Sequence, residues 1–531
     1  MKALAAQTAH KIVIALAATF FAMVTWTSWA RWANFEYRTF DLAYYVQAIW
    51  QLIHGRFAVS VEDVPLLGNH VEPIVFLFAP LFALFRHPML FVFVQNAGLA
   101  AMAPIGYRMA RRLGCDPLRS LLIGALLLLA PATGYIALHE FHPEALTAPL
   151  LLLLLKARLA RSLGRHWLWF GAVLACKENM ALLLAAYCVV NLVTERARGW
   201  VELRRWYLWP LLAALAWFVL CGKVITPAFN SGSIDYLTLY DRLGNSGGEI
   251  LRNAFTQPQL FVRALWQSLT QGNLVWVLLL PFLGFPLLRP RWLVVAAPIL
   301  LQHLLSWRSS EWNIYFHYAA PLLPLFWMAT LEAIAPGEIQ PELEEHAPPA
   351  TPKPGEGGSC PMNGRRRRGA LQMAFVPCLL IAACVVAQAW IGPAPAIAAD
   401  VAKWSSDGAD RVRKNAFIAQ IPTGASVVAP LPYLSHLAMR EKLYSLHYIL
   451  KGLKTLSHAS YEPPPPTDYV LIDRGDGATF DAGAGYYHPE MRTRDGRIIP
   501  SSESLLQAFL ARAQWDAKTQ GELTLLRRRE D

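Results

Sequence analysis

Charge is scarce in this sequence of 531 residues: only 16% are Asp, Glu, Lys or Arg, whereas 55% are hydrophobic. A soluble domain carries about 25% charged residues, so this scarcity excludes an ordinary soluble protein and predicts a polytopic membrane protein. The formal net charge of +11 comes largely from arginines in short segments between apolar runs. That distribution is typical of membrane topology, and we predict no nucleic-acid partner.

Motifs for several reaction classes are also lacking. The seven cysteines include no CxxC pair, which argues against a disulfide framework or a zinc ribbon. There is no Walker loop, no GxGxxG motif after a predicted strand and no GxSxG motif. ATP-driven transport and serine-hydrolase chemistry therefore have no support. The segment HEFHPE at 139–144 spaces its histidines three apart and so does not match the zincin motif HExxH.

Long apolar runs, in contrast, are frequent. The run at 12–30 is long enough to span a membrane, whereas the run at 73–85 is short and is expected to lie at the interface. With 73–85 at the interface, every arginine-rich loop falls on the cytoplasmic side, as the positive-inside rule requires. We therefore predict about eleven transmembrane helices plus interfacial helices, with the N-terminus inside. The runs lie at 12–30, 73–85, 89–107, 118–137, 145–155, 167–176, 180–193, 207–222, 273–288, 292–306, 318–335 and 370–391.

This topology divides the chain into four parts. Residues 1–335 are predicted to form a transmembrane core with an outer loop at 31–88, and 370–391 the last transmembrane helix. Residues 336–369 are rich in Pro, Gly and Glu, which predicts a disordered cytoplasmic linker. Residues 392–531 are predicted to form a small α/β domain on the outer face. It has strand-like runs at 425–431, 442–446, 468–474 and 522–528, and a helical pattern at 504–515.

Asp41 opens an amphipathic run just after the first span. One interpretation is that it caps the helix, accepting hydrogen bonds from the backbone N–H groups of Tyr44 or Tyr45. The other is a catalytic carboxylate that takes a proton from an acceptor hydroxyl or holds a metal near a phosphate leaving group. Ionisable groups beside membrane spans are costly, so a functional role is the default hypothesis.

Histidines and acids gather in the predicted outer loops. His70 and Glu72 have the spacing that places two side chains on one side of an extended segment. His139 and His142 would share a face if the segment were helical. The alternative is a set of solvated loop residues. We predict a divalent metal, Mg, Mn or Zn, with the ligands His70, Glu72, His139, His142 and Glu144.

A third group of polar residues is predicted to bind substrate. Lys177 and Glu178 interrupt an apolar stretch, and adjacent residues point apart on a helix, so each needs another partner. Lys177 and Arg308 carry the positive charge that a phosphate requires, although the aromatic segment 307–318 is also typical of an interfacial belt. The predicted substrate-binding residues are Tyr44, Gln47, Lys177, Glu178, Arg308 and His317.

Taken in order, five stretches resemble a bacterial membrane-protein family of unknown function that is related to the GT-C superfamily of membrane glycosyltransferases. The resemblance implies a GT-C-like fold with a catalytic or metal-binding acid in the first outer loop, at the place of Asp41, and a soluble outer domain at the C-terminus. It also implies sugar donors carried on polyprenyl phosphate. The stretches are FDLAYYVQAIWQLIHG (40–55), NHVEPIVFLFAPLFALF (69–85), HEFHPEAL (139–146), KEN (177–179) and FHYAAPLLPLFW (316–327).

We therefore predict a glycosyltransferase of the bacterial cytoplasmic membrane, with Asp41 as the catalytic residue. It would transfer a sugar from a polyprenyl-phosphate donor to a lipid, glycan or protein acceptor at the outer face. Two alternatives stay open. One is a transporter or flippase of a lipid-linked or anionic substrate, and the other is a non-catalytic scaffold that binds a glycan lipid.

Overall fold

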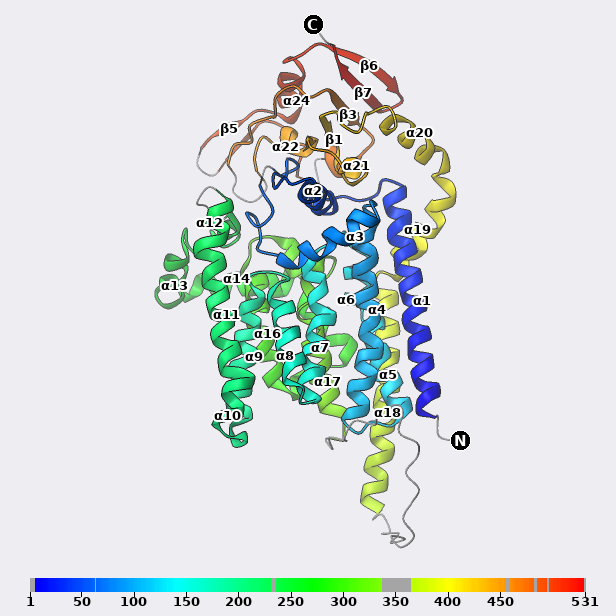
Figure 1. Ribbon diagram of the computed structural model, residues 1–531, viewed down its shortest axis with the longest axis vertical. Coiled ribbons are helices and arrows are strands. Elements are labelled where there is room, and N and C mark those ends of the chain that lie inside the picture. The colour runs from blue at the N-terminus through cyan, green and yellow to red at the C-terminus, as the bar shows by residue number, and fades with distance from the viewer. Residues whose placement is uncertain are drawn as a thin grey trace.

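The computed structural model describes residues 5–529, apart from 63, 231–234, 337–363, 455–458, 482–484 and 494–495. The chain is mostly helical, with a small sheet region near the C-terminus. Figure 1 shows a bundle of long helices with the sheet beyond one end, while the N-terminus lies at the other end. The predicted class, a helical protein with a small C-terminal α/β region, is confirmed at this level.

Three helices are long and apolar enough to cross a membrane within the part of the chain that the structure describes. They are α1 (Ala6–Ala33), α4 (Met89–Arg112) and the continuous helix Trp200–Phe229, which includes α10 (Trp200–Leu203), α11 (Trp209–Leu220) and α12 (Thr226–Phe229).

Two bent helix pairs raise the number to as many as five if each pair is one span. α5 (Pro117–Leu129) and α6 (Pro131–Leu138) meet at 45°, and Phe375–Trp390 of α18 (Gly364–Trp390) meets α19 (Ala394–Ser406) at 50°. The first bend lies at Pro131, whose ring disfavours a helical conformation for the residue before it. The prediction of about eleven spans is not confirmed by these helices and stays a prediction.

Shorter apolar helices fill the rest of the bundle. The segment predicted to lie at the interface forms a 3₁₀ helix, Pro73–Leu77, followed by α3 (Phe78–Leu84). Both pack beside α2 (Asp41–Ile53) at the sheet end of the bundle (Figure 1). The other helices are α7 (Thr147–Leu159), α8 (Leu163–Leu174), α9 (Met180–Thr194), α13 (Gly247–Thr256), α14 (Pro258–Gln271), α15 (Leu274–Leu279), α16 (Pro290–Leu305) and α17 (Leu323–Ile334).

The C-terminal sheet is mixed, with strand order β2-β1-β3-β7-β6. β1 (Val427–Ala429) pairs in parallel with β2 (Leu443–Ser445) and β3 (Tyr469–Asp473), and β7 (Leu523–Arg528) runs antiparallel between β3 and β6 (Trp515–Gln520). All four predicted strands are confirmed. The helices of this region are α20 (Gly408–Ile418), α21 (Leu431–Leu437), α22 (Leu446–Lys451), α23 (Gly477–Phe480) and α24 (Ser502–Leu510), and a separate hairpin pairs β4 (Met491–Arg492) with β5 (Ile498–Ile499).

The strand β6 was not predicted, and the helix predicted at 504–515 ends at Leu510. β6 has the sequence WDAKTQ and lies at the sheet edge with almost every side chain exposed. Without a buried face it has no apolar alternation, which is the signal that marks a strand in a sequence. Gly521, with φ +62°, makes the tight turn from β6 into β7.

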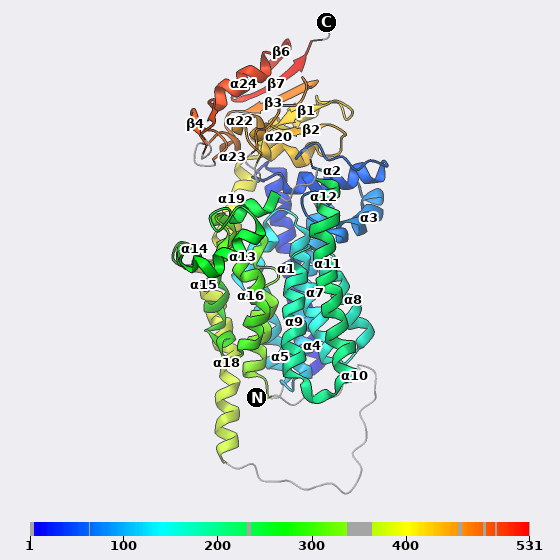
Figure 2. The same cartoon turned by 90° about the vertical axis from the view of Figure 1, so that its left-hand side faces the viewer.

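Specific contacts hold the α/β region on the end of the bundle. Asp400 accepts a hydrogen bond of 2.7 Å from Nε of Arg31 in α1. The ring of His436 in α21 stacks on Trp32, with centroids 4.1 Å apart, and forms a 2.9 Å hydrogen bond to the Trp32 carbonyl. Figure 2 shows α19 rising along the bundle toward the sheet. The linker predicted at 336–369 lies mostly outside the described residues.

Candidate functional site

A cavity of 460 Å³ lies where α2, the loops at the sheet end of the bundle and the α/β region meet. Nine of the twelve side chains predicted to form a site line it, although they come from separate loops of the sequence. Two of the others, Glu144 and Glu178, lie directly behind lining residues. The nine are Asp41, Tyr44, His70, Glu72, His139, His142, Lys177, Arg308 and His317.

Asp41 does not cap its own helix. Its side chain accepts a 2.6 Å hydrogen bond from the Thr39 hydroxyl and makes no capping bond to α2. Glu140 fills that role from a distant loop, since its carboxylate accepts hydrogen bonds from the N–H groups of Thr39 (2.9 Å) and Leu42 (3.1 Å). A carboxylate at a helix N-terminus also interacts favourably with the helix dipole. The capping interpretation of Asp41 is therefore wrong, and its carboxylate is left to face the cavity.

Two histidines approach the Asp41 carboxylate, and a third stacks on one of them. Nε2 of His142 lies 3.5 Å and Nε2 of His139 lies 3.9 Å from the same oxygen, Oδ2 of Asp41. The ring of His317 stacks on His142, with centroids 3.6 Å apart. Burial lowers the pKa of His139 to about 3, and burial also lowers the pKa values of His142 and His317. Their imidazoles are therefore neutral, which is the form that acts as a base or as a metal ligand.

Beneath this group lies a buried ionic network. Lys177 donates a 2.8 Å hydrogen bond to Oε2 of Glu144, and Nε2 of His317 lies 3.6 Å from the same oxygen. His70 forms a 2.9 Å hydrogen bond with Glu178. Although burial acts to raise it, the charge of Lys177 holds the pKa of Glu144 well below its usual range. Lys177 is thus neutralised by Glu144, which makes it a weaker phosphate ligand than its position in the sequence predicts.

Glu72 lies apart from the histidines. It accepts a 2.7 Å hydrogen bond from the Tyr45 hydroxyl, and burial raises the pKa of its carboxyl to about 7. The five predicted metal ligands therefore do not form one set, because His70, Glu72 and Glu144 are engaged with other side chains. Within the described residues, the group with metal-ligand spacing is His139, His142 and His317, whose ligand atoms lie within 4.8 Å of one another.

Two further cations line the cavity wall: Arg308, which the sequence analysis predicted as a site residue, and Lys451, which it did not. Within the described residues, neither forms a hydrogen bond or an ion pair with a carboxylate. Lys451 ends α22 in the α/β region, and burial followed by the charge of Arg308 lowers its pKa. An anion beside Lys451 and Arg308 would offset this unfavourable interaction. Nothing in the sequence around Lys451 marks it, because its partner Arg308 is distant in the chain.

Gln47, predicted to bind substrate, is fully buried and does not line the cavity. Its amide nitrogen donates hydrogen bonds to Ser60 (2.9 Å) and to the carbonyls of Arg440 (3.1 Å) and Glu441 (3.3 Å). Its amide oxygen accepts from the N–H of Val61 (3.1 Å). That prediction is therefore corrected: the residue docks the α/β region on α2.

Leucine at position 47 is expected to weaken this docking by about 1–3 kcal/mol, because it leaves buried backbone groups without partners. Limited proteolysis and thermal unfolding of the purified protein measure the effect. Gln507→Leu, on the exposed face of α24, is the matched control and should behave as wild type. Equal protease resistance of Gln47→Leu and Gln507→Leu would contradict the docking role.

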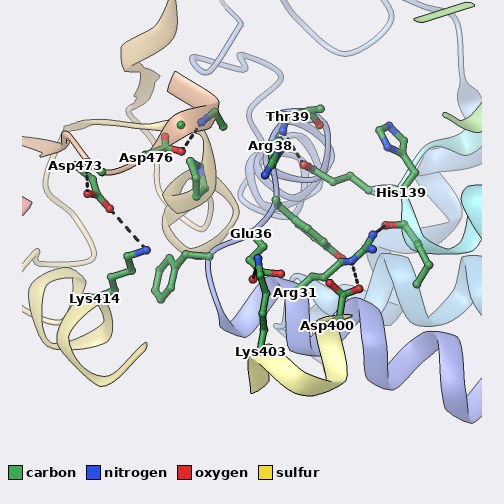
Figure 3. Close-up of a pocket in the computed structure, with 18 of the residues that line it drawn as sticks. Arg31, Glu36, Arg38, Thr39, His139, Asp400, Lys403, Lys414, Asp473 and Asp476 are labelled. Carbon is green, nitrogen blue, oxygen red and sulfur yellow. Dashed lines mark hydrogen bonds and ion pairs between the residues drawn. The ribbon is translucent and has the colours of Figure 1, made fainter. Parts of the chain in front are cut away.

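A second cavity, of 490 Å³, adjoins the first (Figure 3). Thr39 and His139 line both, so the two share a wall. Most of its charges are paired, as in Arg31 with Asp400 and Lys403 with Glu36. Its far side includes Asp473, the last residue of β3, and Asp476 in the loop that follows. The second cavity therefore lies between the bundle and the α/β region, next to the wall that contains His139.

Comparison with known proteins gives a family and shows similarity to solved structures. The family model described as "Predicted membrane protein (DUF2079)" matches residues 31–522. No curated protein matches the sequence. Among solved structures, the chain is similar to the crystal structure of ArnT from Cupriavidus metallidurans bound to undecaprenyl phosphate, with 13% identity and a TM-score of 0.45, over 96% of this chain and 97% of that one. The family match covers most of the bundle and most of the α/β region, and it ends just before β7.

Proposed function

We propose, from the premise that the chain belongs to the DUF2079 family of predicted membrane proteins, that it is a membrane glycosyltransferase. It would transfer a sugar from a polyprenyl-phosphate donor to a hydroxyl of a lipid, glycan or protein acceptor. The resemblance of the loop motifs to GT-C enzymes supports this class of reaction.

The observation that carries the proposal is one cavity with two kinds of charge. Asp41 provides a carboxylate on one wall, and Arg308 and Lys451 provide cations that are not paired with carboxylates within the described residues. Sugar transfer from a phosphate carrier needs both, because an anion departs while a proton must leave the acceptor. The acceptor oxygen bonds to the anomeric carbon, the bond from that carbon to the phosphate oxygen breaks, and Asp41 takes the hydroxyl proton.

The proposed orientation follows from the arginine-rich loops. The arginine-rich C-terminal end of α4 and the segment before α10 lie at the end of the bundle away from the sheet (Figure 1). Positive loops favour the cytoplasmic side, so the cavity and the α/β region would face outward. With the shorter apolar helices counted as spans, about eleven transmembrane helices remain the proposed number. The site would then open at the outer face of a bacterial cytoplasmic membrane, where lipid-linked sugars are accessible.

Replacing Arg308 or Lys451 by glutamine tests the donor site. Each variant is expected to weaken binding of undecaprenyl phosphate by about 10–100-fold, since a hydrogen bond to a charged group is lost. Native mass spectrometry of the full chain in micelles with added undecaprenyl phosphate gives the affinities. Lys442→Gln, an exposed lysine beside β2, is the control and should bind as wild type does.

Two outcomes of that measurement would overturn the donor assignment. One is an affinity of the wild type for phosphatidylglycerol equal to that for undecaprenyl phosphate, which would indicate only attraction to anionic lipid. The other is unchanged binding in Arg308→Gln and Lys451→Gln.

A further inference from the structure

Asp41 and the three neighbouring histidines His139, His142 and His317 have the composition of a transition-metal site. Nε2 of His139 and Nε2 of His142 both approach one oxygen of Asp41, and the ligand atoms of His139, His142 and His317 lie within 4.8 Å of one another. In a tetrahedral zinc site with bonds of about 2.0–2.1 Å, ligand atoms are separated by about 3.3 Å. The three imidazoles already have this spacing to within about 1.5 Å, and Asp41 lies beside two of them.

A second observation also points to a ligand. Nδ1 of His317 is buried and has no hydrogen-bond partner within the described residues. His317 itself is only 4% exposed. An unpaired polar nitrogen is costly in such a place, so native proteins usually satisfy it. A metal ion coordinated by the imidazole would satisfy it.

Neighbouring groups already orient three of the four side chains. The Thr39 hydroxyl holds Asp41 at 2.6 Å, the Glu140 carbonyl lies 3.3 Å from Nδ1 of His142, and the Glu144 carboxylate lies 3.6 Å from Nε2 of His317. Partners of this kind fix the ring orientation of metal-bound histidines in known sites.

We propose that His139, His142, His317 and Asp41 bind one zinc ion at the wall of the cavity. Three imidazoles and one carboxylate favour zinc over magnesium or calcium, which prefer oxygen ligands. The cavity beside the four side chains leaves room for an oxygen ligand from water or substrate. The ligand set differs from the one expected from the sequence, in that it gains His317 and Asp41 and loses His70, Glu72 and Glu144.

This assignment deepens the proposed function without depending on it. In the transferase, one Asp41 oxygen would bind zinc while the other accepts the acceptor proton, and the ion would bind the acceptor oxygen and lower its pKa. Metal binding itself requires only the four side chains, so it is measured without any assay of transfer.

The test is the metal content of the full chain, purified with its affinity tag removed and then incubated with zinc chloride and desalted. Wild type is expected to retain about one zinc ion per chain by elemental mass spectrometry. His139→Gln, His142→Gln and His317→Gln should each lose most of it. Two controls should keep it: His54→Gln, at the exposed end of α2, and His70→Gln, which separates the two possible ligand sets.

Cobalt in place of zinc gives a readout that does not need the variants to fold. The wild-type protein with Co²⁺ should show visible ligand-field bands of a nitrogen-rich site with low coordination number, and zinc should displace them. A wild type that retains no zinc, equal zinc in all variants, or a cobalt spectrum of the hydrated ion would overturn the proposal. If the wild type retains no zinc but its sugar transfer still depends on Asp41, the zinc site is wrong and the proposed transferase function stands.

Discussion

Asparagine at position 41 is expected to lower the rate of sugar transfer by about 10²–10⁴-fold, the usual contribution of a positioned general base. Asp41 is the carboxylate that faces the histidine-lined part of the cavity, and Glu140 carries the helix-capping role in its place. Asparagine has nearly the same shape and can keep the contact with Thr39. The loss should therefore be in the chemical step and not in folding.

The measurement uses membranes that contain the chain, radiolabelled polyprenyl-phosphate sugars extracted from the same cells, and the movement of label out of the carrier fraction. Asp516→Asn, on the exposed edge strand β6, is the matched control and should transfer at the wild-type rate. Asp41→Asn should still bind undecaprenyl phosphate, which separates catalysis from donor binding. Transfer by Asp41→Asn at the wild-type rate would remove Asp41 from the catalytic role.

The sequence predicted the fold best where hydrophobic pattern and secondary structure coincide. The strands β1, β2, β3 and β7 have buried apolar residues, and all four were predicted. The spans were harder to predict because the bundle contains breaks. Pro131 divides an apolar stretch that looks like one continuous span in the sequence, and the structure bends there by 45°.

The site illustrates a different limit. Unusual residue types in a hydrophobic chain identified most of the cavity wall, because charged groups near a membrane are costly unless they are used. The sequence could not show which of these residues pair with one another, because each pair joins loops that are distant in the sequence. Glu140 could not be recognised as the cap of α2, nor Lys451 as a neighbour of Arg308, without the three-dimensional arrangement. The five residues predicted as one ligand set do not lie together for the same reason: spacing within a loop cannot reveal that Glu144 pairs with Lys177.

The buried pair of Lys177 and Glu144 gives the largest expected effect on stability. The Lys177 side chain is 12% exposed and that of Glu144 is 1% exposed, with Nζ 2.8 Å from Oε2. Methionine at position 177 leaves a carboxylate charged and buried without its counter-ion, and breaking a pair in this way costs about 3–5 kcal/mol. We expect Lys177→Met to lower the unfolding temperature of the detergent-solubilised protein strongly and to reduce its yield.

A second substitution makes this prediction specific to the pair. Adding Glu144→Gln to Lys177→Met removes the uncompensated charge, so the double variant should be more stable than Lys177→Met alone. An effect of lost packing would not produce this recovery.

The control is an exposed ion pair. Lys403→Met breaks a comparable contact with Glu36, but the Lys403 side chain is 54% exposed, and such pairs contribute only about 0–1 kcal/mol. The measurement is thermal unfolding of four variants against wild type: Lys177→Met, Glu144→Gln, the double variant and Lys403→Met. Strictly additive losses, or a Lys177→Met protein as stable as Lys403→Met, would show that the network does not depend on this charge pair. Recovery in the double variant would instead show that the uncompensated charge of Glu144 causes the loss of stability in Lys177→Met.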